Sequence, residues 1–440
     1  MGASGRLLNR RCDATPLNPA NCALPAARPS PLCTSGIPNG QIRFKRAAHG
    51  GSGRDPVGPR DQVVDVSEPR AGDSTRAPTS LREMLTTVAS GRAPVVAVPA
   101  RNEADRLPLL LAALTRQTWC QRGGRLPVVL VLNNCTDRSA EVVEAQRSLH
   151  PRLDLTVMEV TLTGDAAHVG TARRMAMDQA LEGRADAAVA LLTTDADAQP
   201  EAGWIDANLA ALEAGADLVG GRIIGDPVEE ARLGAGFQRR VERHLRYAEL
   251  CDRLAALMDP LAHDPLPRHR DHTGASLAVR GDVYRTLGGL PPLPFREDVS
   301  FVRRARAAGF LLRHCPAVRV RVSARLEGRA PGGMADCLRS WTEAEAKGET
   351  HLVESPDSLL VRLARRRAIR SGAVIAADAP VSRTALEDLG MNLHGSWPVE
   401  ARVELWASDD LDAPGETPVE AAIAVLETLL EEANVYVVAA

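Results

Sequence analysis

The chain has few aromatic residues, only a slight excess of negative charge and no long apolar segment. Phe, Trp and Tyr make up 3% of the 440 residues, which argues against a surface that stacks on nucleic-acid bases. The formal net charge is −3, so there is no electrostatic case for nucleic acid or an anionic membrane as the main partner. No stretch approaches the roughly 18 to 20 apolar residues that a membrane-spanning helix needs.

The cysteines and the amino terminus also lack familiar signals. The eight cysteines are scattered and contain no C-x-x-C pair, which argues against a zinc site or a disulfide framework. Residues 1–6 have no apolar core like that of a signal peptide, and Arg6 stands where a myristoylation motif has Ser or Thr. These absences predict a soluble cytoplasmic protein with reduced thiols and no transmembrane segment.

The composition divides the chain into three parts. Residues 1–90 are rich in Pro, Gly, Ser and Arg and show no sustained periodicity, so we expect a disordered tail. Residues 91–350 alternate short apolar runs with amphipathic segments and are predicted to form the main domain. Residues 351–440 form an extension of unknown role without a catalytic pattern, and its closing helix is predicted to begin at Thr417-Pro418.

The main domain begins with a regular alternation of strands and helices. Apolar runs predict strands at residues 95–98, 126–132, 155–160 and 187–193. Apolar residues at helical spacing predict helices between them, at residues 104–115, 139–148 and 170–181. This alternation predicts an α/β fold with a mainly parallel, Rossmann-like sheet. Further elements are predicted at residues 204–214, 217–221, 229–258 and 280–287.

Two aspartates, Asp195 and Asp197, follow the strand predicted at residues 187–193. Residues 187–192 carry no charge and read as a buried strand, and ligands of such sheets bind just beyond the carboxyl ends of the strands. Two carboxylates there suit Mg²⁺ or Mn²⁺, which usually also binds phosphate oxygens of the substrate. A structural cap is the alternative interpretation of this pair taken alone.

Three other loops are predicted at the same edge of the sheet. Together with the aspartates they span residues 99–103, 133–137, 164–174 and 195–197. Convergence of loops at one edge is what a nucleotide site in an open α/β sheet requires.

The motifs in these loops, and three that follow them, resemble those of family-2 glycosyltransferases with the A-type fold. In chain order they are Val98-Pro99-Ala100-Arg101-Asn102-Glu103, Leu132-Asn133-Asn134-Cys135-Thr136-Asp137, Gly170-Thr171-Ala172-Arg173, Asp195-Ala196-Asp197, Gly274-Ala275-Ser276-Leu277-Ala278-Val279-Arg280, Leu287-Gly288-Gly289-Leu290 and Arg296-Glu297-Asp298. The resemblance covers about residues 94 to 330, so residues 91–350 are expected to be the catalytic domain.

The resemblance implies a metal-dependent transfer of sugar from a nucleotide-diphosphate donor to an acceptor hydroxyl. Asp197 would be the principal ligand of Mn²⁺ or Mg²⁺, with Asp195 also at the metal and nearer the ribose or donor sugar. Asp298 would be the general base, and Glu297 would orient or bind the acceptor. The implied donor-binding residues are Pro99, Arg101, Asn102, Glu103, Asn133, Asn134, Arg173 and Asp195, and the implied acceptor-binding residues are Gly274, Ala275 and Ser276.

The sequence departs from the family pattern at two points. Asn133 and Asn134 stand where relatives usually have aspartates, one of which accepts the uracil N–H, so the base is open. Many relatives also have a metal-binding His after the last core strand, where residues 318–325 contain Ser323 and no His. Two alternatives to a glycosyltransferase are therefore kept: a nucleotidylyltransferase, although residues 99–103 lack the glycine of its phosphate loop, and an inactive nucleotide-sugar-binding protein.

Several of these residues also have purely structural interpretations. Glu297 and Asp298 could be charges favoured at a helix amino terminus, and Arg173 could be a surface ion-pair residue or a phosphate contact. His168 could be a ligand contact or an ordinary loop residue. Four residues suggest a metal cluster, but their spacing matches no usual site and favours a loop near the acceptor: His263, Asp264, His269 and His272.

Overall fold

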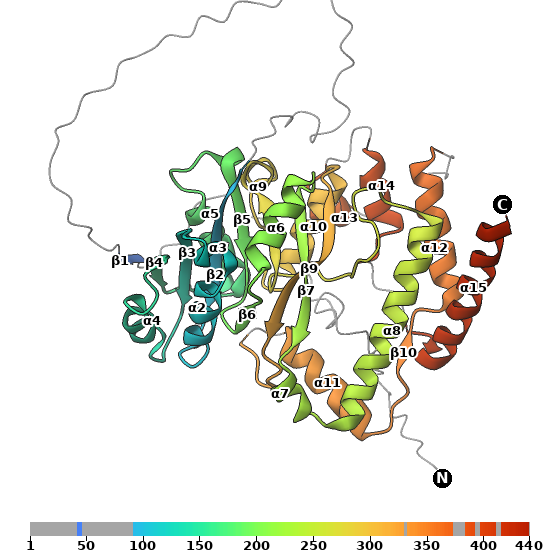
Figure 1. Ribbon diagram of the computed structural model, residues 1–440, viewed down its shortest axis with the longest axis horizontal. Coiled ribbons are helices and arrows are strands. Elements are labelled where there is room, and N and C mark those ends of the chain that lie inside the picture. The colour runs from blue at the N-terminus through green and yellow to red at the C-terminus, as the bar shows by residue number, and fades with distance from the viewer. Residues whose placement is uncertain are drawn as a thin grey trace, which may run out of the picture.

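The structure is a computed structural model that describes residues 42–45, 91–329, 332–372, 383–391, 397–410 and 415–439. It is built around a nine-stranded sheet with the strand order β1-β4-β3-β2-β5-β8-β7-β9-β6 (Figure 1). The strands are β1 (Ile42–Lys45), β2 (Ala93–Ala100), β3 (Leu126–Asn133), β4 (Leu153–Val160), β5 (Val189–Thr193), β6 (Ala198–Pro200), β7 (Leu218–Gly225), β8 (Leu277–Arg280) and β9 (Leu312–Val322).

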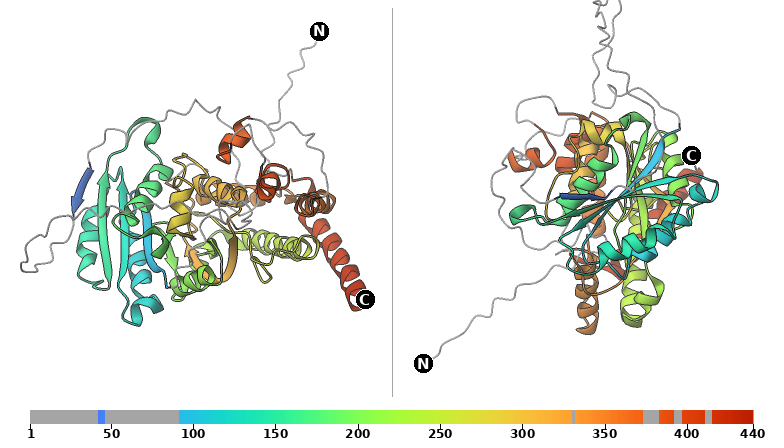
Figure 2. Two further views of the ribbon diagram at one scale, coloured as in Figure 1. Left: turned by 90° about the horizontal axis from the view of Figure 1, so that it is seen from above. Right: turned by 90° about the vertical axis from the view of Figure 1, so that its left-hand side faces the viewer.

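Helices cover both faces of this sheet (Figure 2). They are α2 (Leu107–Thr115), α3 (Thr118–Gln121), α4 (Ser139–Arg147), α5 (Val169–Ala180), α6 (Trp204–Glu213), α7 (Pro227–Ala231), α8 (Gly234–Met258), α9 (Gly281–Thr286), α10 (Glu297–Ala307) and α11 (Met334–Ala346). The remaining elements are β10 (Leu352–Val353), α12 (Pro356–Arg370), α13 (Arg383–Asp388), α14 (Val399–Trp406), β11 (Thr417–Pro418) and α15 (Val419–Ala439).

The predicted α/β fold is confirmed. Strands β2 to β5 are mutually parallel, and β7 and β9, which are parallel to each other, run in the same direction as these four. Six of the nine strands therefore share one direction, while β1, β8 and β6 run against it. Local periodicity did not predict the antiparallel strand β8, which is inserted between β5 and β7.

Alternate residues of β2 show why its sequence is apolar throughout. Val96 and Val98 belong to the core cluster on one face of the sheet, which includes residues of α2 and α6. Val95 and Ala97 belong to the cluster on the other face, with residues of α5, α9 and α10. A strand buried on both faces needs apolar residues at every position, and each fully buried aliphatic side chain contributes ~1.5–3 kcal/mol.

Strand β1 lies inside the segment for which we expected no structure. Residues Ile42–Lys45 pair antiparallel with β4 at the edge of the sheet, with Ile42 opposite Val160. The expectation of a disordered tail was therefore wrong for these four residues, whose Ile-Arg-Phe-Lys alternation is too short to stand out as a strand. The rest of residues 1–90 lies outside the described residues.

The extension after residue 350 packs on the main domain. Apolar residues of α8, α12 and α15 form one core cluster, and Figure 1 shows these three helices side by side. The closing helix α15 begins at Val419, directly after the predicted Thr417-Pro418 start. Within the described part of the chain, no helix combines the length and apolar character needed to cross a membrane.

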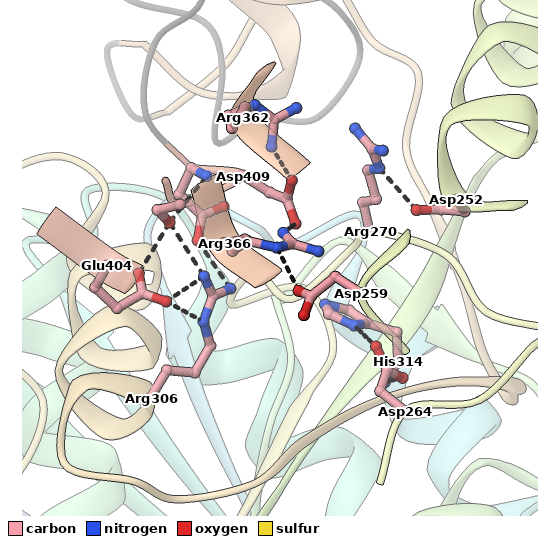
Figure 3. A network of polar contacts seen from close by, with 12 residues as sticks. Asp252, Asp259, Asp264, Arg270, Arg306, His314, Arg362, Arg366, Glu404 and Asp409 are labelled. Carbon is pink, nitrogen blue, oxygen red and sulfur yellow. Dashed lines mark hydrogen bonds and ion pairs between the residues drawn. The ribbon is translucent and has the colours of Figure 1, made fainter. Parts of the chain in front are cut away.

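A network of buried ion pairs also joins the extension to the main domain (Figure 3). Arg306 of α10 contacts Glu404 of α14 and Asp410, and Arg366 of α12 contacts Asp259 at 2.8 Å. A buried carboxylate and guanidinium that pair in this way leave neither charge uncompensated. Helix α14 and Asp410 are thereby tied to the helix that begins with Glu297, and α12 is tied to the residue that follows α8.

Candidate active site

A cavity of about 830 Å³ opens at the carboxyl ends of the parallel strands. Ten of the residues predicted for the site line it: Pro99, Arg101, Glu103, Asn133, Arg173, Asp195, Asp197, Ala275, Glu297 and Asp298. The other four, Asn102, Asn134, Gly274 and Ser276, are not among its lining residues. The structure thus brings together residues from six separate segments of the chain, as expected for ligand sites in open α/β sheets.

Arg173 is the central residue of the cavity wall. Helix α5 places its guanidinium, which is 4% exposed, among four protein acceptors. Nη2 donates to Asp195 Oδ1 at 2.7 Å, Nε to Glu297 Oε1 at 3.0 Å, and Nη1 to Gly274 O at 2.9 Å and Thr193 Oγ1 at 3.1 Å. The interpretation of Arg173 as a surface residue was therefore wrong.

The surroundings of Arg173 are fitted to its charge. A Cβ added to Gly274 would lie 2.3 Å from the guanidinium carbon, so glycine at this position lets the loop approach the arginine. Burial acts to lower the pKa of Arg173, but the charges of Asp195 and Glu297 outweigh it and raise the pKa above its ordinary value. Arg173 fixes the positions of these two carboxylates, and its contact with a donor phosphate stays a prediction.

Asp197 has a second arginine as its partner. Nη2 of Arg325, the third residue after β9, lies 2.9 Å from Asp197 Oδ2. The same guanidinium forms a two-pronged pair with Glu103, from Nη1 to Oε2 at 2.7 Å and from Nη2 to Oε1 at 2.5 Å. Burial and the neighbouring charge of Asp195 raise the pKa of Asp197 to about 7, although Arg325 acts in the opposite direction.

The acidic pair Glu297 and Asp298 begins helix α10 and faces the same cavity. Asp298 accepts hydrogen bonds from the backbone N–H of Gly274 at 2.5 Å and of Val299 at 2.7 Å. Glu297 is buried against Arg173, and burial together with the charge of Asp298 raises its pKa to about 7. Both residues do occupy a helix start, where negative charge is favourable, and in addition they line the cavity.

The two asparagines after β3 differ in their surroundings. Asn134 has a left-handed backbone, with φ of 51°, and its amide bonds both the N–H and the carbonyl of Leu162 at 2.9 Å. Asn133 lines the cavity, and its buried Oδ1 has no hydrogen-bond partner among the described residues. Of the pair, Asn133 is the one with an acceptor available to a ligand. Asn102, with φ of 54°, instead shapes its loop by accepting the Thr136 N–H at 2.8 Å.

Sequence reasoning missed the wall of the cavity that follows β9. Arg325, Arg329 and Met334 all line the cavity, and none was predicted to. The one available signal was position, because residues 323–325 directly follow the last core strand. His168, a predicted alternative, lines the cavity and caps α5, since its Nδ1 accepts the Thr171 N–H.

The histidine-rich loop before Thr273 forms hydrogen bonds within the protein. His272 Nδ1 lies 3.1 Å from His314 Nε2, and His314 Nδ1 lies 2.8 Å from Asp264 Oδ2. Among the described residues, no three His, Cys, Asp or Glu side chains converge as metal ligands. These hydrogen bonds, from Asp264 through His314 to His272, therefore anchor the loop that carries Thr273 and Gly274 into the site.

An α/β sheet with a large cavity and an acidic pair at its strand ends has the layout of ligand sites in open α/β folds. Residues 95–257 match the model of the family described as Glycosyl transferase family 2. This match confirms the resemblance over that segment and identifies the chain as a glycosyltransferase. Gly274, Glu297 and Asp298 lie beyond the matched segment.

Comparisons with solved structures give similar chains of low identity. TarS 1–349 of S. aureus in complex with UDP is 15% identical, with a TM-score of 0.38, over 67% of this chain and 79% of that chain. The mannosyltransferase PcManGT of Pyrobaculum calidifontis, in complex with GDP-Man and Mn²⁺, is 17% identical, with a TM-score of 0.36, over 72% of this chain and 88% of that chain. A search of curated proteins finds no match.

Proposed function

We propose that this chain transfers a sugar from a nucleoside-diphosphate donor to an acceptor hydroxyl, with a divalent cation on the diphosphate. The observation that carries the proposal is the gathering of Asp195, Asp197, Glu297 and Asp298 in one cavity at the strand ends. The two acidic pairs suit the two reacting groups, the departing diphosphate and the acceptor hydroxyl. The first pair suits a cation on the leaving group, and the second suits a base for the acceptor.

The chemistry of the first pair fits Mg²⁺ or Mn²⁺. Arg173 contacts Oδ1 of Asp195 and Arg325 contacts Oδ2 of Asp197, and each carboxylate has a second oxygen. Two protein carboxylates completed by phosphate oxygens are a usual ligand set for these cations. Such a cation would neutralise charge on the departing diphosphate.

Asn133 is proposed to bind the base of the nucleotide. Its buried Oδ1 has no partner within the described structure, and a buried acceptor left without a donor costs ~1–3 kcal/mol. An N–H on the edge of a base would supply that donor. Both uracil and guanine carry such an N–H, so this contact admits either base.

Asp298 is proposed as the general base. The N–H groups of Gly274 and Val299 hold its carboxylate in one orientation. A positioned carboxylate of this kind can accept the proton of an acceptor hydroxyl. Glu297 is held by Arg173 and would orient the acceptor beside it. Gly274 belongs to the loop proposed to line the acceptor side, so base and acceptor loop are joined by a direct hydrogen bond.

A panel of uridine and guanosine diphospho-sugars tests the proposal. We expect release of the nucleoside diphosphate from at least one donor in the presence of Mn²⁺, and loss of that release in Asp197→Ala. Asp154→Ala, which removes an exposed carboxylate of β4, is the matched control and should behave as wild type. Donor binding without any turnover would instead support an inactive nucleotide-sugar-binding protein.

A further inference from the structure

Arg325 combines a firm anchor with a place at the cavity. Its guanidinium pairs with both oxygens of Glu103, a side chain that is itself only 6% exposed. Glu103 is held in turn, because its backbone N–H donates to Ser139 Oγ at 2.9 Å. Two parallel hydrogen bonds to one carboxylate fix the orientation of an arginine more firmly than a single contact does. Arg325 therefore presents a fixed positive charge to the cavity.

That charge also contacts one of the two carboxylates proposed to bind the cation. Nη2 of Arg325 lies 2.9 Å from Asp197 Oδ2. A divalent cation that binds the other oxygen of Asp197 must share the carboxylate with Arg325, whose positive charge lies a few ångströms away and repels it. A diphosphate at the same place experiences the opposite effect, because a guanidinium donates strong charge-assisted hydrogen bonds to phosphate oxygens.

We propose that Arg325 makes the binding of the cation depend on the diphosphate. Without a nucleotide, Arg325 occupies Asp197 and weakens the binding of a free cation. When the cation arrives with a diphosphate, Asp197 turns to the cation and Arg325 donates to the phosphate oxygens while Glu103 keeps it in place. The inference rests on the proposed function, since it takes the diphosphate to lie at Asp195 and Asp197.

The test titrates Mn²⁺ alone, and inorganic pyrophosphate with saturating Mn²⁺, into full-length wild type and Arg325→Gln. We expect the variant to bind Mn²⁺ alone about 5-fold or more tighter, within the usual range of coupling between two ligands. We expect it to bind pyrophosphate about 10-fold or more weaker, as for the loss of a hydrogen bond to a charged group. Opposite changes in the two affinities are the signature of the proposal.

Arg319→Gln is the matched control. Arg319 lies on β9, the strand that precedes Arg325, but it does not line the cavity, and its side chain is 47% exposed with Nε 3.6 Å from Glu201. Both affinities should stay within about 3-fold of wild type in this variant, a change too small to count as a lost charged hydrogen bond. Arg325→Lys serves if Arg325→Gln does not fold: it should keep Mn²⁺ binding weak while it loses pyrophosphate affinity.

Each other outcome overturns a defined part of the account. If Arg325→Gln weakens both affinities, or changes neither, Arg325 has only a structural role and the inference is wrong. If wild type binds neither pyrophosphate nor a nucleoside diphosphate with Mn²⁺, the proposed function itself fails. A wild type that binds both, beside an Arg325→Gln variant that behaves like Arg319→Gln, leaves the proposed function intact and refutes the inference alone.

Discussion

Removal of the Arg173 guanidinium is expected to destabilise the fold and to make its stability depend on pH. Arg173→Met would leave Asp195 and the buried Glu297 without their common partner. Breaking a buried pair by removing one member costs about 3–5 kcal/mol, and we expect a loss of this size in the free energy of unfolding at pH 8.

The pH dependence follows from Glu297. Its pKa in wild type is about 7, raised by burial and by Asp298 above the ordinary value of about 4.3, and the loss of Arg173 raises it further. A raised carboxyl pKa gives stability that is present at low pH and is lost as the pH rises through the folded pKa. Below pH 7 Glu297 is protonated in both proteins. The difference between them should therefore grow above pH 7, by up to about 1.4 kcal/mol per pH unit.

Urea denaturation at pH 6 and pH 8 measures this effect, with Arg174→Met as the control. Arg174 is the next residue of α5, with a side chain 36% exposed that donates to the carbonyls of Gly288 and Leu290. Its loss should cost no more than about 1.5 kcal/mol at either pH. An Arg173→Met protein within 1 kcal/mol of wild type at pH 8, or a loss equal at both pH values, would refute the reasoning.

Further substitutions test the proposed base and the stability contributed by two buried titratable residues. Asp298→Asn should lower the transfer rate by about 10²–10⁴ while it binds a nucleoside diphosphate as wild type does. Glu297→Gln should lower the rate less. If Glu297→Gln lowers the rate more than Asp298→Asn, Glu297 is the base. His351 is buried, and burial together with nearby arginines lowers its pKa to about 3. Wild type should therefore lose about 2 kcal/mol of unfolding free energy between pH 7.5 and pH 5, and His351→Phe should retain it. Parallel pH profiles of the two proteins in urea would contradict this. Asp264→Asn should lower the free energy of unfolding by about 3–5 kcal/mol in urea at pH 7, because Asp264 is the buried partner of His314. That pairing holds the Asp264 pKa below its usual range, so the stability advantage of wild type should shrink as the pH falls below about 4. An equal difference at pH 7 and pH 3 would argue against the pairing.

The half of the fold that local patterns encode could be predicted from the sequence. Strands β2, β3 and β5 are apolar on both faces because helices cover both, so each reads as a short apolar run. The acidic pair after β5 could be placed at the ligand-binding edge for the same reason, and the structure puts it in the cavity. These inferences depend on strand direction and burial, which a single strand and its neighbours determine.

Contacts between distant segments could not be predicted in this way. Arg325 and Glu103 are 222 residues apart, and they meet only because β9 lies beyond the inserted antiparallel strand β8 in the sheet. The docking of α12 and α15 on α8 likewise depends on apolar residues from three separate helices. Asn134 was assigned to the donor, but its left-handed turn directs the amide to Leu162. Periodicity describes one segment at a time and contains no information about such partners.

Calorimetric titration of a nucleoside diphosphate, with Mn²⁺ and with chelator, tests the central claim most directly. The claim is that the cavity holds a diphosphate through a cation on Asp197. We predict that wild type binds UDP or GDP with Mn²⁺, that chelator removes most of this affinity, and that Asp197→Ala binds equally weakly under both conditions. Equal affinity with Mn²⁺ and with chelator in wild type, or unchanged metal-dependent binding in Asp197→Ala, would contradict the account.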